Sequence, residues 1–136
     1  MTQRPNRIES CSKTQARTRL EHARKFLDVA ELIADTDDAD YASASAALAV
    51  LAGIAATDAA CCKALGHRSR DQDHRQAAAL VERVTDGRQA ATTLRRLLSL
   101  KDEAHYGFFD VSGQHLRAAL RQTQTLVAFA DAVMQR

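Results

Sequence analysis

Apolar and polar positions along the chain follow a helical period, and one stretch has almost no polar positions. Residues 42–65 read ASASAALAVLAGIAATDAACCKAL, where the only side chains charged at pH 7 are those of Asp58 and Lys63. A surface helix shows one polar side, whereas a helix that is apolar on nearly every side is buried among other helices. The pattern therefore predicts a central helix over residues 42–65, covered by the rest of the chain.

The first and last helices are predicted to be amphipathic covers for the central one. Apolar residues recur at alternating steps of four and three from Ser12 to Ala34, with Ser12 or Thr14 as the N-terminal cap. The acidic run at residues 35–40 is interpreted as a cap and a solvated loop. Ser112 is the expected cap of the last helix. Its predicted inward face is Leu116, Ala119, Leu120, Thr123, Leu126, Val127, Ala130, Val133 and Met134.

Two shorter helices are predicted between these. Gly66 is expected to end the central helix, and Asp71 or Asp73 to cap a third helix that contains His74 and stops at Gly87. A fourth helix is expected from about residue 89 to residue 105.

No stretch alternates apolar with polar residues over the length of a strand, so no strand is predicted. The fold class is therefore all-α, an antiparallel bundle of about five helices around a central apolar helix. We expect residues 12–136 to form this domain and residues 1–11 to be a flexible N-terminal tail.

Composition and charge limit the possible partners and the possible cellular compartment. The net charge of +2 is too small to imply nucleic-acid binding by bulk electrostatics. Asp58 interrupts the apolar run before it is long enough for a membrane span, and residues 1–15 lack the apolar core of a secretory signal, so we expect a soluble cytoplasmic protein without a membrane partner. Three cysteines (Cys11, Cys61 and Cys62) suggest a reduced compartment and no disulfide framework.

Asp58 is a polar residue where the pattern asks for an apolar one. An unpaired buried carboxylate costs several kcal/mol, so Asp58 needs a partner. We expect it to be largely buried and paired with Lys101, or else with Arg68 or His105. A buried ion pair that fixes helix register and a functional role are both open interpretations.

Lys101 and His105 are the second departure from the pattern. Extending the apolar face of the fourth helix beyond Leu98 leads to Lys101 and then His105, four residues apart and therefore neighbours on one face. A histidine beside a cation stays neutral and can act as a base, which makes both residues candidate catalytic groups. The alternative is that the helix frays here and both side chains reach solvent.

Common catalytic and cofactor motifs are missing from the sequence. A di-metal carboxylate bundle needs a Glu-x-x-His pair on each of two helices, which this chain lacks. It also has no glycine-rich phosphate loop and no GxSxG motif. We therefore expect no cofactor and no metal site.

Three segments carry a resemblance to a known family. AALAVLAGIAATDAACCKALG, with Asp58 in an A-x-D-A setting, looks like the second helix of the HEPN family (the higher eukaryotes and prokaryotes nucleotide-binding domain). DHRQAAALVERV, which includes His74, is similar to that family's next helix. LLSLKDEAHYGFFDVSGQHLRAAL, with Tyr106 after His105, resembles its closing signature. The resemblance covers most of residues 42–136 and implies a helical domain that is often dimeric.

The resemblance also implies a function. Some family members cut RNA without metal, and others are inactive partners in toxin–antitoxin or defence systems. Active members have an arginine that holds the phosphate, four to six residues before a histidine that helps the ribose hydroxyl attack. The matching positions here are Leu98, Ser99 and Leu100, so the family arginine is missing, and Lys101 would bind phosphate only as a point charge.

The sequence therefore predicts a catalytically weak or inactive module that binds nucleic acid or nucleotide, in a toxin–antitoxin, defence or DNA-repair-associated system. Its expected ligand-binding residues are Asp58, Arg68, His74 and Tyr106. A protein-interaction subunit without a ligand is the alternative, and a metal-independent endoribonuclease is a third hypothesis. The expected partners are a second copy of the chain, RNA or a nucleotide, and a protein such as a nucleotidyltransferase.

Overall fold

The computed structural model describes residues 8–70, 74–101, 104, 107 and 110–136. These residues form five α-helices, one short 3-10 helix and two short strands, which confirms the all-α class. In chain order the elements are β1 (Ile8–Ser10), α1 (Lys13–Asp35), η1 (Ala39–Tyr41), α2 (Ala42–Leu65), β2 (His67–Ser69), α3 (Arg75–Glu82), α4 (Gly87–Leu98) and α6 (Gly113–Met134).

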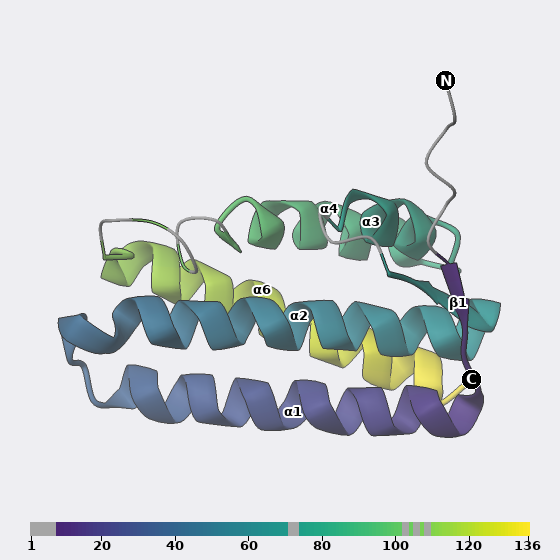
Figure 1. The fold of residues 1–136 in the computed structure, drawn as a ribbon, viewed down its shortest axis with the longest axis horizontal. Helices are drawn as coiled ribbons and strands as arrows, with labels where there is room; N and C mark the ends of the chain where they lie inside the picture. Colours follow the sequence, from purple (N-terminus) through teal and green to yellow (C-terminus); the bar gives the residue numbers. More distant parts are fainter. Residues whose placement is uncertain (1–7, 71–73, 102–103, 105–106, 108–109) are drawn as a thin grey trace.

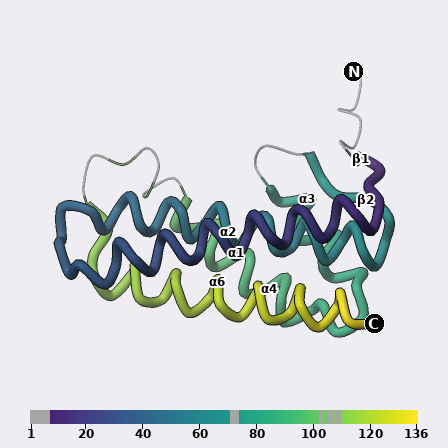
Figure 2. The backbone as a smooth tube through the Cα atoms, turned by 90° about the horizontal axis from the view of Figure 1, so that it is seen from below, coloured from purple at the N-terminus to yellow at the C-terminus, as the bar shows by residue number. Residues whose placement is uncertain are grey.

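Helix α2 occupies the centre of the bundle, as predicted. Figure 1 shows α1 on one side of it and the short helices α3 and α4 on the other, with α6 running behind. In the view turned by 90° in Figure 2, α1 lies over α2 and α6 runs along one side of them. Residues Ala39–Leu65 are long and apolar enough to cross a membrane, but 83% of the apolar window is buried inside the protein. This is the core helix of a helical bundle, which is consistent with a soluble protein.

Three predicted helix ends are confirmed. Ser12 caps α1 in a reciprocal capping box, because its hydroxyl accepts from the Gln15 N–H and Gln15 Oε1 accepts from the Ser12 N–H. Gly66 ends α2 in the left-handed conformation (φ 77°), which favours glycine. Ser112 caps α6 by accepting from the N–H of His115. The predicted inward stripes of α1 and α6 are also the faces that these helices bury.

The predicted limits of α3 and α4 are wrong in part. His74 lies outside α3 as its N-cap, in the left-handed conformation (φ 59°), and Asp71 and Asp73 lie outside the described residues. Gly87 begins α4, where a Cβ atom would lie 1.9 Å from the carbonyl oxygen of Val81. The turn between α3 and α4 therefore needs glycine for close approach. Helix α4 ends at Leu98, well before the predicted residue 105.

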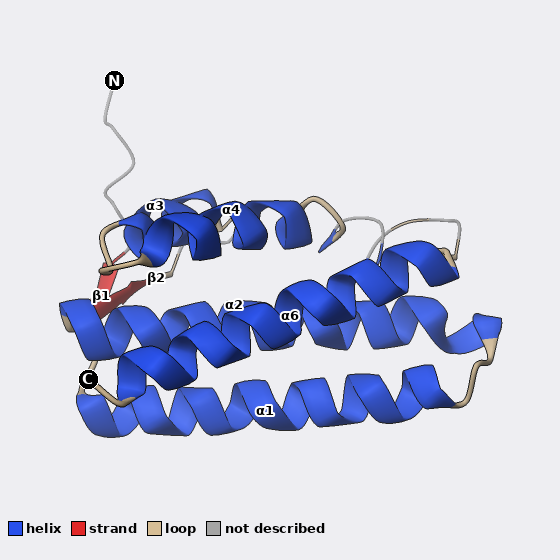
Figure 3. Cartoon of the chain, turned by 180° about the vertical axis from the view of Figure 1, so that it is seen from behind, coloured by secondary structure: helices blue, strands red, loops and turns tan. Residues whose placement is uncertain are grey.

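The N-terminal segment contains structure that the sequence pattern missed. Strand β1 pairs antiparallel with β2, with Ile8 opposite Ser69 and Ser10 opposite His67. Figure 3 shows both strands at one end of the bundle, beside the C-terminal end of α2. Residues 8–11 therefore belong to the folded domain and not to a tail. A three-residue strand is too short for apolar alternation to reveal it.

The cysteine prediction is also corrected, because Cys11 and Cys62 form a disulfide and only Cys61 is free. The strand pairing brings Cys11 to the last turn of α2, where its N–H donates to the carbonyl of Gly66 at 2.9 Å. The disulfide closes a loop over a sequence separation of 51 residues, so it ties the N-terminal strand to the central helix. A disulfide of this kind is typical of an oxidising environment.

The disulfide gives a direct prediction. In denaturant without reductant, the chain should show one reactive thiol of its three cysteines, and all three after reduction. Reduction should also lower the free energy of unfolding by about 2–4 kcal/mol, because the unfolded chain regains loop entropy. Urea unfolding with and without reductant measures this loss. The Cys11→Ser variant, compared under the same two conditions, should show no effect of reductant, and three thiols in the untreated wild type would contradict the assignment.

Candidate functional site

Asp58 lies inside the fold and is 6% exposed. Its Oδ2 atom accepts from Arg19 Nε at 3.2 Å and Arg19 Nη2 at 3.1 Å, and from Arg68 Nη1 at 3.3 Å. The predicted burial and cation pairing are confirmed, and Arg68 is one of the expected partners. Arg19 was not expected.

Lys101 is not the partner of Asp58, because α4 runs back along α2 in the opposite direction. A Cβ atom at Gly53 would lie 2.2 Å from Leu97 Cδ2, so the end of α4 lies against the middle of α2. Leu100 then packs against a small apolar cluster that includes Ala42 and Ala46 at the beginning of α2. The chain that leads to Lys101 is therefore moving away from Asp58, which follows Gly53 by more than one turn.

Two chain reversals bring the arginines to Asp58. Helices α1 and α2 are antiparallel, and the Ser45 hydroxyl donates to the carbonyl of Ala30 at 2.7 Å. This register places Arg19, near the beginning of α1, level with Asp58 near the end of α2. Arg68 comes from β2, which folds back directly after Gly66.

The ion pairs continue beyond Asp58 to the N-terminal strand. Arg68 donates from Nε at 3.2 Å and from Nη2 at 3.1 Å to Glu9 Oε2, and Arg70 Nε lies 3.6 Å from the same oxygen. Arg68 thus bridges a buried carboxylate on α2 and a partly exposed one on β1. The side chains of Arg19 and Arg68 are 29% and 31% exposed, so both guanidinium groups reach from the buried carboxylate toward the surface.

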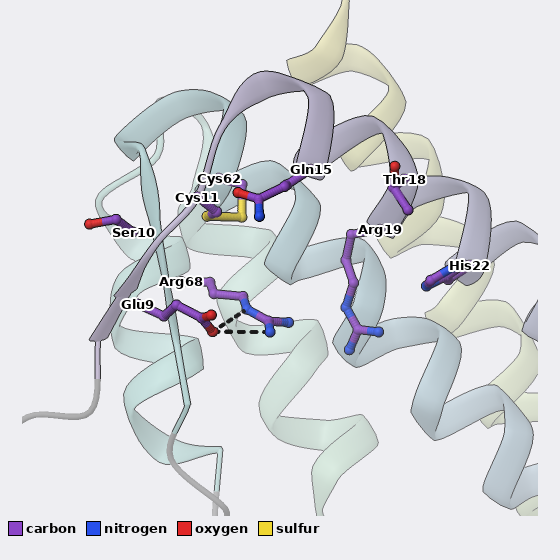
Figure 4. A pocket seen from close by; sticks show the side chains of 9 residues that line it. All are labelled: Glu9, Ser10, Cys11, Gln15, Thr18, Arg19, His22, Cys62 and Arg68. Carbon is purple, nitrogen blue, oxygen red and sulfur yellow. Dashed lines mark hydrogen bonds and ion pairs between the residues drawn. A yellow bond between two sulfur atoms is a disulfide. The ribbon is translucent and has the colours of Figure 1, made fainter.

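A pocket of about 220 Å³ opens beside these arginines (Figure 4). Its walls are the beginning of α1, strand β1 and the disulfide. The lining residues are Glu9, Ser10, Cys11, Gln15, Thr18, Arg19, His22, Cys62 and Arg68. In Figure 4 the guanidinium group of Arg68 extends toward that of Arg19, and His22 lies beyond Arg19 on the same helix.

Burial perturbs two titrating groups in this region. It raises the pKa of the Asp58 carboxyl above its usual value, and the charges and hydrogen bonds of Arg19 and Arg68 offset that rise in part. Burial together with the negative charge of Asp58 raises the pKa of the Cys61 thiol to about 12. Cys61 is therefore protonated at neutral pH, which makes it unsuitable as a nucleophile.

Neither Lys101 nor His74 is among the residues that contact Asp58. Lys101 follows the end of α4, and His74 precedes α3. His105 and Tyr106 lie outside the described residues. Of the six predicted residues, the structure thus brings together Asp58 and Arg68. It adds Arg19, Glu9 and the disulfide. Of these three, Arg19 had a signal in the sequence, since it neighbours the apolar stripe of α1.

A second hollow lies between the end of α4 and the first half of α6. Its volume is about 270 Å³, and it is lined by Arg96, Ser99, Leu100, His115, Ala118, Ala119 and Gln122. We call it the α4–α6 groove. Figure 3 shows these two helices next to each other across the face of the molecule seen from behind. Among the described residues, its polar lining contains a cation, an imidazole, a hydroxyl and an amide, and none of these residues is a carboxylate.

Comparison of the chain with protein-family models and with curated proteins found no match. The geometry of the pocket beside Arg19 and of the α4–α6 groove is therefore the basis for the functional inferences that follow.

We call Asp58, Arg19, Arg68, Glu9 and Arg70 the Asp58 cluster. Removing both cations that contact Asp58 should have a strong, pH-dependent effect on the free energy of unfolding. Arg19→Ala with Arg68→Ala should lower the free energy of unfolding by about 3–5 kcal/mol at pH 7, because a buried carboxylate is left without a counter-charge. The pKa of Asp58, already raised by burial, rises further in this variant. A raised folded-state pKa favours the fold below the unfolded pKa and loses that contribution as the pH increases, so the deficit should shrink on acidification.

Urea unfolding at pH 7 and pH 4 measures this difference. Adding Asp58→Asn to the double variant should restore much of the stability at pH 7, since no buried charge remains. The control is Arg17→Ala with Arg83→Ala, two exposed arginines whose removal should change stability by no more than about 0.5 kcal/mol each. An equal loss at both pH values, or no recovery with Asp58→Asn, would contradict the assignment.

Proposed function

We propose that this chain is a HEPN-like helical domain that binds the phosphate groups of RNA or a nucleotide and is catalytically weak or inactive. The observation that supports the proposal is the α4–α6 groove, where Arg96 and His115 line one hollow together with neutral polar side chains. An arginine recognises phosphate with a fixed fork of donors, and an imidazole adds a further donor.

The charge of the two helices supports the same ligand. Helix α4 carries Arg88, Arg95 and Arg96, and α6 carries Arg117 and Arg121. The sequences of both helices contain one acidic residue between them, Asp131, near the end of α6. Arg95 Nη2 lies 2.7 Å from Glu82 Oε1 of α3, and this ion pair offsets the charge of Arg95. Most of the positive charge of α4 and α6 therefore remains. The overall charge of +2 hides this local excess, which would attract a polyanion.

Efficient cleavage does not follow from this arrangement. RNA cleavage without metal needs a base for the ribose hydroxyl and a firm clamp on the phosphate as charge develops. In the family pattern both come from an arginine and a histidine four to six residues apart. Here Arg96 precedes His115 by 19 residues and lies on a different helix. We therefore propose that the groove binds phosphate without the family's catalytic arrangement.

Binding of a short single-stranded RNA should be weak and salt-dependent, and it should depend on Arg96. Arg96→Gln should weaken binding severalfold at low salt and reduce the slope of log K against log salt by about 0.7, the value for one lost phosphate contact on a single strand. Fluorescence anisotropy across a salt series measures both quantities. Arg17→Gln, on the exposed side of α1, removes the same charge outside the groove and should leave binding nearly unchanged.

Equal weakening by both variants would mean that binding is bulk electrostatics, which would contradict the groove. The same RNA should remain uncut after incubation without metal. A 2′,3′-cyclic phosphate product that disappears in His105→Ala would overturn the proposed inactivity and favour the ribonuclease hypothesis.

A protein-interaction role is the second candidate, because large apolar side chains are exposed on α1 and α2. Leu32 is 67% exposed and Val29 is 45% exposed on α1, and Leu51 is 39% exposed on α2. A domain whose central helix is largely alanine buries modest apolar area per residue, so association with a second copy would add to its stability. We therefore propose a homodimer.

Sedimentation at micromolar concentration should show a species of twice the 14.9 kDa chain mass. Leu32→Ser should shift the equilibrium toward monomer if the exposed face of α1 forms the contact, while the exposed polar substitution Arg17→Ser should not. A wild-type monomer at that concentration would refute the dimer.

A further inference from the structure

The pocket between β1 and α1 has the features of a binding site that is separate from the α4–α6 groove. Its volume of about 220 Å³ equals the liquid volume of about seven water molecules, enough for a small polar group with its immediate substituents. The disulfide between Cys11 and Cys62 forms part of its wall and fixes β1 against α2. The walls are thus held by a covalent bond and by the buried Asp58 cluster.

Three side chains on one face of α1 offer hydrogen-bond donors to this pocket. The hydrogen bonds of Arg19 to described residues use Nε and Nη2, which leaves both N–H groups of Nη1 for a ligand. Gln15 Oε1 is held by the Ser12 N–H in the capping box, so the Gln15 amide group presents its NH₂ end. His22 is exposed and lies one turn beyond Arg19, as Figure 4 shows.

The local charge also favours an anion. Within the described part of the lining Glu9 is the acidic residue, and its Oε2 atom is already engaged by Arg68, with Arg70 nearby. Asp58 is buried and engaged by Arg19 and Arg68. Counted over the described residues, the cluster therefore contains three guanidinium groups and two carboxylates, an excess of one positive charge. A buried carboxylate that fixes two arginines also removes the entropy they would lose on binding a ligand.

We propose that this pocket is an anion site that binds a phosphate group, with Arg19, Gln15 and His22 as its donors and Arg68 as the facing cation. A phosphate group has three terminal oxygens and a charge of about −1.5 to −2 at neutral pH, which matches three donors that approach from separate positions along α1. A carboxylate has a single negative charge and its acceptor lone pairs lie in one plane, so it fits donors spread along a helix less well.

Titration calorimetry with inorganic phosphate, at constant ionic strength set with chloride, tests the site. Wild-type protein should bind about one phosphate per chain at this site. His22→Ala removes an exposed side chain outside the Asp58 cluster, so the fold should be kept while affinity falls about tenfold. Arg19→Lys keeps a cation for Asp58 but loses the second nitrogen, and it should weaken binding by a similar factor. Thermal unfolding of each variant confirms that the fold is kept.

The control is Arg17→Ala, an exposed side chain of α1 outside the pocket, which should leave this phosphate binding unchanged. His115→Ala reports separately on phosphate bound in the α4–α6 groove. A nucleoside monophosphate titrated in the same way distinguishes a phosphate ester from free phosphate, and either bound with the same dependence on His22 supports the site. Absence of binding, equal or tighter binding of acetate, or loss of binding in His115→Ala alone would overturn the proposal. RNA binding that falls in Arg96→Gln but not in His22→Ala would show that the α4–α6 groove binds RNA whether or not this pocket binds phosphate.

Discussion

The structure depends on one buried charge. The carboxyl of Asp58 lies near the end of the most buried helix, where an unpaired charge would cost several kcal/mol. Its three N–H donors come from two elements far apart in sequence, α1 and β2. Satisfying Asp58 therefore requires that α1 be antiparallel to α2 in one register and that the chain reverse immediately after Gly66. A slip of α1 by one turn would remove Arg19 from the carboxylate.

The same constraint explains why the N-terminal strand is ordered. Arg68 reaches both Asp58 and Glu9, so the cluster that fixes β2 also binds β1. The antiparallel pairing of the strands then places Cys11 beside Cys62, and the disulfide makes the attachment covalent. Ion pairs, strand pairing and disulfide all hold the pocket beside α1 in one shape. The α4–α6 groove lies away from this cluster, because α4 runs toward the opposite end of α2.

The sequence alone predicted the parts of the fold that depend on local pattern. The bounds of α2, the caps at Ser12, Gly66 and Ser112, and the buried stripe of α1 all follow from periodicity and capping chemistry, and all are confirmed. The burial of Asp58 followed from its position in an apolar helix. Arg68, one of the expected partners, is confirmed. The favoured partner Lys101 is wrong, because it was chosen from the extrapolated stripe of α4, which ends at Leu98.

What sequence reasoning missed depends on contacts between distant segments. A three-residue strand has no readable period, so neither β1 nor the disulfide that follows from it could be predicted. Predicting the pairing of Arg19 with Asp58 requires the register of α1 against α2. That register is visible only in the folded chain, where the Ser45 hydroxyl donates to the carbonyl of Ala30. The grouping of Arg96 with His115 likewise appears only when α4 and α6 lie together.

NMR titration of the side-chain carboxyl carbon of Asp58 shows whether this group is a desolvated carboxyl held by two arginines. We expect a pKa above the ordinary aspartate value of 3.8, because burial outweighs the two cations. In Arg19→Lys the pKa should stay raised, because the carboxyl remains buried and one cation is exchanged for another. A carboxyl that titrates at or below 3.8 in the folded wild-type protein would contradict the account, since Asp58 would then be either exposed to water or overcompensated by its arginines.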